Sequence, residues 1–171
     1  MIRTVVPSCS LPNAYFTPVS VLVMTIVAAI DGRKRTDPVV SVGADLAEAY
    51  GEELVVLHVV PEDEFEEHRR EITRLDGSAD YSFTQEEQSA ERLVDDVVDE
   101  TLGAHEASVT SVGRVGSPTE AILSLARDRD ARYLVIGGKK RSPVGKAVFG
   151  SVTQSVLLDA DRPVVTAIDD E

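Results

Sequence analysis

The chain is poor in the residues that staple small domains or stack on nucleic acid bases. Cys9 is the one cysteine among 171 residues, which excludes an internal disulfide framework and a multi-cysteine zinc or iron–sulfur site. Tryptophan is absent and aromatic residues make up 5% of the chain, so we expect no base-stacking platform for single-stranded nucleic acid. The length predicts about one domain, which buries roughly 70% of its unfolded surface and needs no staple.

Basic residues are also scarce. Thirty acidic side chains and seventeen basic ones give a net charge of −13 and a pI near 4.6. This balance opposes a broad footprint on nucleic acid phosphates and predicts a strongly hydrated surface, as in proteins of salt-loving organisms. The 43% share of hydrophobic residues is that of a globular domain. We therefore expect a cytoplasmic protein without a nucleic acid or membrane partner.

The first segment differs from the rest. Residues 1–20 hold three prolines, one charged side chain and no periodicity. We expect residues 1–23 to be a disordered tail, or a gene-model extension with the true start at Met24. The apolar run at 19–30 is too short to span a bilayer and could be a secretory signal. Because Asp31-Gly32 follows it like the exit from a sheet, we interpret its end as a strand.

From residue 25 onward, short Val/Ile/Leu-rich runs alternate with segments of helical period. Such runs are typical of strands buried on both faces of a parallel sheet. The expected strands are residues 25–30, 54–60, 109–115, 133–136 and 164–168. Their alternation with helices predicts right-handed crossovers. The predicted fold is an α/β three-layer sandwich with a five-stranded parallel sheet, of the flavodoxin or Rossmann-like type.

Capping signals mark the predicted helices. Asp37-Pro38 supplies an N-cap and a first-turn proline, and Gly51 ends that helix. Residues 84–87 (TQEE) and 117–120 (SPTE) are expected to be capping boxes. The last helix is marked by Val148, Val152 and Val156. The acidic connection at 61–83 is expected to be a solvated excursion with one helical turn, or alternatively a mobile flap.

In doubly wound sheets, ligands bind beyond the carboxyl ends of the strands, at the point where the strand order reverses. This rule selects the loops at 31–37 and 137–150. The second loop enters a helix at Gly150-Ser151, where backbone N–H groups can bind an anion. It is neither a Walker P-loop nor a GxGxxG fingerprint. Seven of the seventeen basic residues lie in these loops and predict an attraction for polyanions: Arg33, Lys34, Arg35, Lys139, Lys140, Arg141 and Lys146.

The sequence offers little for catalysis, and we expect at most weak enzymatic activity. A nucleophile-elbow GxSxG motif is absent. His58 lies in a buried strand pattern and is expected to be a core histidine, whereas His68 and His105 are expected to be solvated. The acidic clusters at 62–67 and 95–100 are expected to be solvated faces, although an acidic pair together with phosphates could hold Mg²⁺.

From Met24 to Ile168 the chain resembles a universal stress protein domain, which is assigned to residues 24–171. The pieces that carry the resemblance are IVAAIDG at 26–32, LVVLHVVP at 54–61, GRVGSPTEAI at 113–122, YLVIGG at 133–138, and the final glycine-serine, helix and strand. Their order and spacing are specific, whereas no single piece would be. The resemblance implies the fold of the adenine nucleotide α-hydrolases.

ATP-binding members of this family carry a glycine, two residues, a second glycine, nine residues and then Gly-Ser or Gly-Thr. Gly137 and Gly150-Ser151 match this motif, whereas Lys140 stands at the second glycine. Lys140 could contact the phosphates or block their approach. The resemblance implies that Asp31 binds the ribose, that Val59 offers backbone groups to adenine, and that the Gly150 segment holds phosphates. The whole implied site for ATP, with or without Mg²⁺, is Ala29, Asp31, Val59, Ile136, Gly137, Lys139, Lys140, Gly150, Ser151 and Val152.

The resemblance also implies a homodimer through the last strand, from Val164 to Ile168. An exposed apolar edge strand invites such pairing. Our first hypothesis is a small nucleotide-binding module of the stress response. The alternatives are a slow ATP hydrolase, and a dimerisation module that no longer binds nucleotide.

Overall fold

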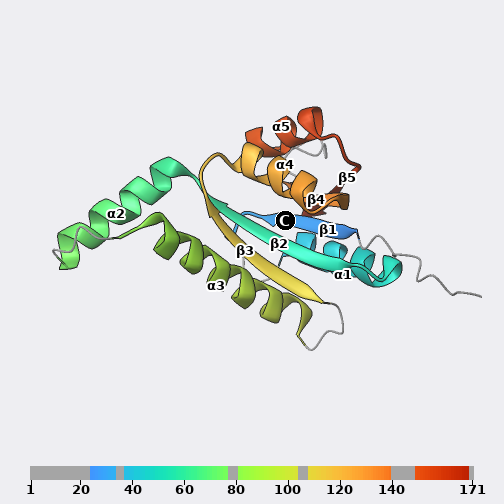
Figure 1. The fold of residues 1–171 in the computed structure, drawn as a ribbon, viewed down its shortest axis with the longest axis horizontal. Coiled ribbons are helices and arrows are strands. Elements are labelled where there is room, and N and C mark those ends of the chain that lie inside the picture. Colours follow the sequence, from blue (N-terminus) through green and yellow to red (C-terminus); the bar gives the residue numbers. More distant parts are fainter. Residues whose placement is uncertain (1–23, 34–36, 77–80, 104–107, 140–148, 170–171) are drawn as a thin grey trace, which may run out of the picture.

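Five parallel strands form one sheet in the order β3-β2-β1-β4-β5 (Figure 1). The computed structural model describes residues 24–33, 37–76, 81–103, 108–139 and 149–169. The strands are β1 (Thr25–Ile30), β2 (Glu53–Val60), β3 (Val109–Val115), β4 (Ala131–Lys139) and β5 (Val164–Asp169). The helices are α1 (Pro38–Tyr50), α2 (Glu62–Asp76), α3 (Phe83–Leu102), α4 (Pro118–Asp128) and α5 (Ser151–Asp159). All pairings are parallel, which confirms the predicted fold class.

The end of the apolar run at 19–30 forms a strand, as predicted: β1 begins at Thr25. β1 lies in the middle of the sheet, between β2 and β4. Successive side chains of a strand alternate between the two faces, so Ile26 and Ala28 enter one core and Val27 the other. All three side chains are fully buried. A continuous apolar run in the sequence therefore serves two cores at once.

The helices cover the sheet in two layers. α1 and α3 pack on one face, where their side chains join the core of Ile26, Val56 and Val135. α4 and α5 pack on the other face, against Leu57 and Leu134 (Figure 1). This division follows from right-handed crossovers, because the chain moves from β1 to β3 in one direction and returns to β4 on the other side of β1.

The limits of β4 and α5 differ most from the prediction. β4 continues through Gly137 and Gly138, which were expected in a loop, because these residues pair with Ala167 and Ile168 of β5. α5 begins at Ser151, and Val148 lies outside the described residues. The backbone partners that β5 supplies hold glycine in a strand, although glycine has a low strand propensity.

The predicted helix caps are partly right. The Asp37 carboxylate accepts a hydrogen bond of 2.9 Å from the Val39 amide, as expected for an N-cap. The capping box of α3 is formed by Ser82 and Gln85, not by residues 84–87, so the prediction was two residues late. Ser117 occupies the N-cap of α4, but its side chain makes no capping hydrogen bond. The predicted box at 117–120 is therefore wrong in its chemistry, although the helix start is correct.

The acidic connection at 61–83 contains a long helix, so the prediction of one helical turn is wrong. α2 runs for 15 residues and projects from the body of the domain (Figure 1). Its first turn is acidic and Arg74 lies in its last turn, an order of charges that stabilises a helix through its dipole. The Phe65 ring is buried and stacks on Phe83 with 4.3 Å between centroids, which anchors α2 to α3.

The described residues contain no candidate for a membrane-spanning helix. None of the helices there combines the length and the apolar character that a bilayer crossing requires.

Gly113 lets α3 lie close to β3. A β-carbon at this position would lie 2.0 Å from the Glu87 carbonyl oxygen and 2.7 Å from the Glu91 amide nitrogen. Both atoms belong to the backbone of α3, so no side-chain rotation relieves the clash. The distance between α3 and the sheet therefore depends on a missing side chain.

We expect the Gly113→Ala substitution to lower the free energy of unfolding by about 2 kcal/mol or more, because overpacked cores force backbone shifts. For a chain of this length the melting temperature should fall by about 4–8 °C in calorimetry. Gly150→Ala is the matched control, since no atom of the described residues lies within 4 Å of its β-carbon position and its φ of −67° suits alanine. An unchanged melting temperature for Gly113→Ala would contradict this packing.

Candidate functional site

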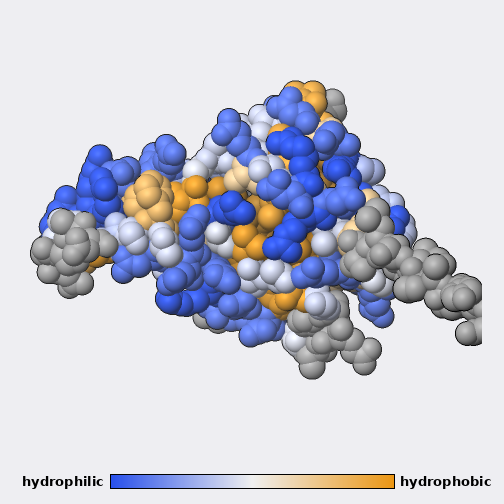
Figure 2. Space-filling view, viewed as in Figure 1, coloured by the Kyte–Doolittle hydropathy of each residue, from blue (hydrophilic) through white to orange (hydrophobic). Residues whose placement is uncertain are grey.

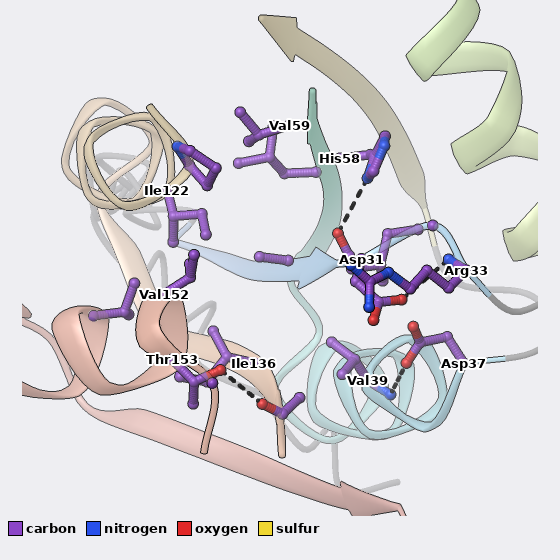
Figure 3. Close-up of a pocket in the computed structure, with 18 of the residues that line it drawn as sticks. Asp31, Arg33, Asp37, Val39, His58, Val59, Ile122, Ile136, Val152 and Thr153 are labelled. Carbon is purple, nitrogen blue, oxygen red and sulfur yellow. Dashed lines mark hydrogen bonds between the residues drawn. The ribbon is translucent and has the colours of Figure 1, made fainter. Parts of the chain in front are cut away.

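A cavity of about 680 Å³ opens at the carboxyl ends of the strands. We call it the switch-point cavity, because it lies where the chain, having moved outward from β1 to β3, returns to β4. Residues from β1, β2, β4, α1, α4 and α5 line it (Figure 3). The structure thus places a cavity where the topology rule predicts a ligand site.

One side of the cavity is apolar. Val59 at the end of β2 faces Ile122 of α4, and Val152 of α5 lies beside Ile136 of β4 (Figure 3). Ala29 of β1 also contributes to this wall. A flat apolar ring fits such a wall better than a charged group, because polar groups lose hydration there.

The other side is polar. Asp31 follows β1 directly, and its carboxylate accepts a hydrogen bond of 3.0 Å from the Arg33 amide. Asp37, the N-cap of α1, lies across from it (Figure 3). The Asp37 amide donates to the Thr101 hydroxyl at 3.1 Å, which ties this loop to the end of α3. These contacts give Asp31 a defined place at the mouth of the cavity.

The N-terminus of α5 forms a third wall. Gly150 is its N-cap, and among the described residues no side chain caps the backbone N–H groups of the first turn. The Thr153 hydroxyl donates to the Gly137 carbonyl at 3.0 Å (Figure 3), and the Gln154 side chain donates to the Phe149 carbonyl at 2.8 Å. The first bond fixes α5 against β4, and the second holds the residue that precedes α5 to its first turn. An uncapped helix start with a positive dipole end is a suitable site for an anion.

Gly138 lines the switch-point cavity and is tightly packed. A β-carbon here would lie 2.8 Å from the Phe149 ring and 3.0 Å from Ile168. Gly138 thus makes room for the ring that precedes α5. At Gly137, by contrast, the nearest atom to a β-carbon would be 3.4 Å away on Val39, so its backbone is the more open of the two.

Eight of the ten residues assigned to the site from the sequence line the switch-point cavity. They are Ala29, Asp31, Val59, Ile136, Gly137, Gly150, Ser151 and Val152. Lys139 is the last residue of β4, and its side chain lies outside the described residues, as does all of Lys140. Of the seven bases in the two loops, Arg33 lines the cavity. The attraction of these basic residues for polyanions therefore remains a prediction.

The histidines have different surroundings. His58 is half-buried, and its Nδ1 atom lies 3.2 Å from the Ile30 carbonyl, in keeping with the expected core histidine. His58 also lines the switch-point cavity (Figure 3). His68 is exposed, as expected, and its Nδ1 atom lies 3.0 Å from the buried carboxylate of Glu86. His68 lies on α2, a helix that the sequence analysis did not predict, and α2 brings it to Glu86 of α3. His105 lies outside the described residues.

Sequence reasoning missed several cavity residues. Ile122 and Thr153 line the cavity, as do Asp37 and Phe149, which lie in the two loops selected by the topology rule but were not assigned to the site. Ile122 could have been found, because it lies one helical turn after the start of α4. The role of Thr153 has no sequence signal, since its partner is a backbone carbonyl in another element.

In the described part of the chain, no group of three or more His, Cys, Asp or Glu residues is placed to hold a metal ion. Nothing there supports a metal site built from protein side chains alone. Asp31, Asp37 and Glu64 are carboxylates that line the cavity. Together with bound phosphates, such groups could complete the shell of Mg²⁺.

Comparisons with known proteins agree on one family. The model of the universal stress protein family matches residues 23–167. A universal stress protein of Mycolicibacterium smegmatis is 47% identical over 47 residues, which cover 28% of this chain and 36% of that protein. The match thus spans about a third of the length of this curated relative.

Solved structures give the same answer over most of the chain. A universal stress protein from Archaeoglobus fulgidus is 26% identical with a TM-score of 0.55, over 84% of this chain and 97% of that one. A universal stress protein of the same organism in complex with dAMP is 22% identical with a TM-score of 0.51, over 84% and 96%. A universal stress protein in complex with cAMP is 20% identical with a TM-score of 0.51, over 85% and 96%. The last two show the fold alone. With the family model covering most of its length, the chain belongs to the universal stress protein family.

Proposed function

We propose that this protein binds an adenine nucleotide in the switch-point cavity as part of a stress response. One observation carries the proposal: an apolar wall, a carboxylate and an uncapped helix start surround a single cavity of about 680 Å³. These three features match the three chemical parts of a nucleotide. Two universal stress proteins of the same fold are complexes with dAMP and with cAMP, which supports this ligand class.

The base fits the apolar wall. Val59 and Ile122 lie opposite each other there, and Val59 is 8% exposed. Val59 is also near the end of β2, and a strand end can offer backbone groups to the polar edge of adenine. The ring would then be held by apolar contact on its faces and by the main chain at its edge.

The sugar and the phosphates fit the polar walls. Asp31 is exposed at the mouth of the cavity and can accept hydrogen bonds from ribose hydroxyls. The first turn of α5, from Ser151 to Thr153, offers N–H groups and the positive end of its dipole to phosphates. For ATP, we expect Lys139 and Lys140 to contribute positive charge to the phosphates, with Mg²⁺ bound alongside.

The Asp31→Ala substitution should weaken ATP binding roughly tenfold or more, because charge-assisted hydrogen bonds contribute about 1.5–3 kcal/mol. Titration calorimetry with ATP and Mg²⁺ measures the affinity. Asp45→Ala is the matched control, since Asp45 is exposed on α1 and does not line the cavity.

Equal affinities for Asp31→Ala and the unaltered protein would contradict the ribose role of Asp31. Failure of the unaltered protein to bind ATP, ADP or AMP would overturn the proposal as a whole. That outcome would favour the alternative of a dimerisation module.

We also infer a homodimer through β5, which is an edge strand of the described sheet. The Leu134 amide donates to the Pro163 carbonyl at 3.0 Å, and Leu134 pairs with Val164. In a parallel ladder this bond turns the backbone groups of Val165 toward β4 and those of Val164 and Thr166 away from it. The outward groups are available to a second copy of the strand.

The choice of residue decides the test. Thr166→Pro removes an outward N–H group and should convert the dimer of 18.5 kDa chains to monomer in light scattering. Thr166→Val, which keeps the N–H group, should remain dimeric. Val165→Pro would instead break the pairing with β4. A dimer that persists in Thr166→Pro would place the interface elsewhere.

A further inference from the structure

A second cavity of about 370 Å³ lies between α2, α3 and the end of β2. We call it the α2–α3 cavity. It shares His58, Glu64 and Leu93 with the switch-point cavity but extends away from α5, along α2. The nucleotide proposal gives it no role.

The carboxylate of Glu86 is the unusual feature of this cavity. Glu86 lies on α3 and is 4% exposed. Its Oε1 atom lies 3.0 Å from Nδ1 of His68, whereas its Oε2 atom has no hydrogen-bond partner in the described part of the chain. A buried carboxylate oxygen without a donor is costly, and buried polar atoms normally have one. A ligand with a hydrogen-bond donor would satisfy it.

The charges around Glu86 favour a cationic donor. Glu64 and Glu71 of α2 line the same cavity, as do His58 and His68. Burial raises the pKa of the Tyr81 hydroxyl, and the nearby negative charge of Glu86 raises it further. Tyr81 therefore stays protonated at neutral pH and adds no charge. The lining described here contains no lysine or arginine.

The remaining lining is apolar. Val60, Ala90 and Leu93 form its floor, and Ile72 and Leu75 of α2 form its rim. Leu75 is 84% exposed, so its apolar surface lacks cover. Figure 2 shows apolar surface where α2 joins the body of the domain. A metal ion would gain nothing from this apolar lining, and the described side chains contain no ligand group of three or more for it.

We propose that the α2–α3 cavity binds a small organic compound with a primary ammonium group and an apolar body. The ammonium group donates to the free Oε2 atom of Glu86, and the acidic side chains of α2 favour its charge. The apolar body lies against Ala90 and Leu93 and covers Ile72. This proposal does not depend on nucleotide binding in the switch-point cavity.

The probe is phenethylammonium, which carries an ammonium group on an aromatic body, and phenethyl alcohol is its neutral counterpart. We expect phenethylammonium to shift the amide resonances of Ala90, Leu93 and Ile72 in an NMR titration of the full chain at pH 7. The alcohol should bind at least about tenfold more weakly, since it lacks the charge-assisted hydrogen bond. The Glu86→Gln substitution should weaken the binding of phenethylammonium by about the same factor.

The control variant is Glu91→Gln, which makes the same change of charge at an exposed position of α3 outside both cavities. It should leave the affinity unchanged. Because the comparison of amine and alcohol uses the unaltered protein, it holds even where Glu86→Gln fails to fold. Equal affinity for the amine and the alcohol, no shift at these resonances, or a Glu86→Gln affinity equal to that of the unaltered protein would overturn the proposal.

Discussion

The pairing of β1 with β4 is the constraint on which the rest of the structure depends. It joins two halves of the sheet that the chain builds in opposite directions, with β2 and β3 on one side and β5 on the other. The cavity lies at the strand ends where the directions part, as the topology rule predicts. Asp31 and Gly137 enter the cavity because they lie at the ends of these two strands.

The same topology brings helix starts to this edge of the sheet. α1, α4 and α5 each follow a strand, so each begins beside the cavity and contributes a residue to its lining. The starts are not equivalent. Asp37 caps α1 with its carboxylate, whereas the N-caps of α4 and α5 make no side-chain hydrogen bond. In a chain with a net charge of −13, these uncapped helix starts give an anion a local attraction that the overall charge does not.

Much of this arrangement could be predicted from the sequence. The apolar runs located five strands, and the Asp37-Pro38 and Gly150-Ser151 pairs located helix starts, because these signals are local. The length of α2 could not be predicted, since its surface is charged and its one deep anchor, Phe65, packs on residues distant in the sequence. The bond between Thr153 and Gly137 and the burial of Glu86 were missed for the same reason. Each depends on two elements that come together only in the fold.

A crystal structure of the protein grown with ATP and Mg²⁺ tests the central claim most directly. Our account predicts the adenine ring between Val59 and Ile122, the ribose hydroxyls on the Asp31 carboxylate, and the phosphates on the first turn of α5. A nucleotide bound outside the switch-point cavity, or a cavity that stays empty at saturating ATP, would contradict it.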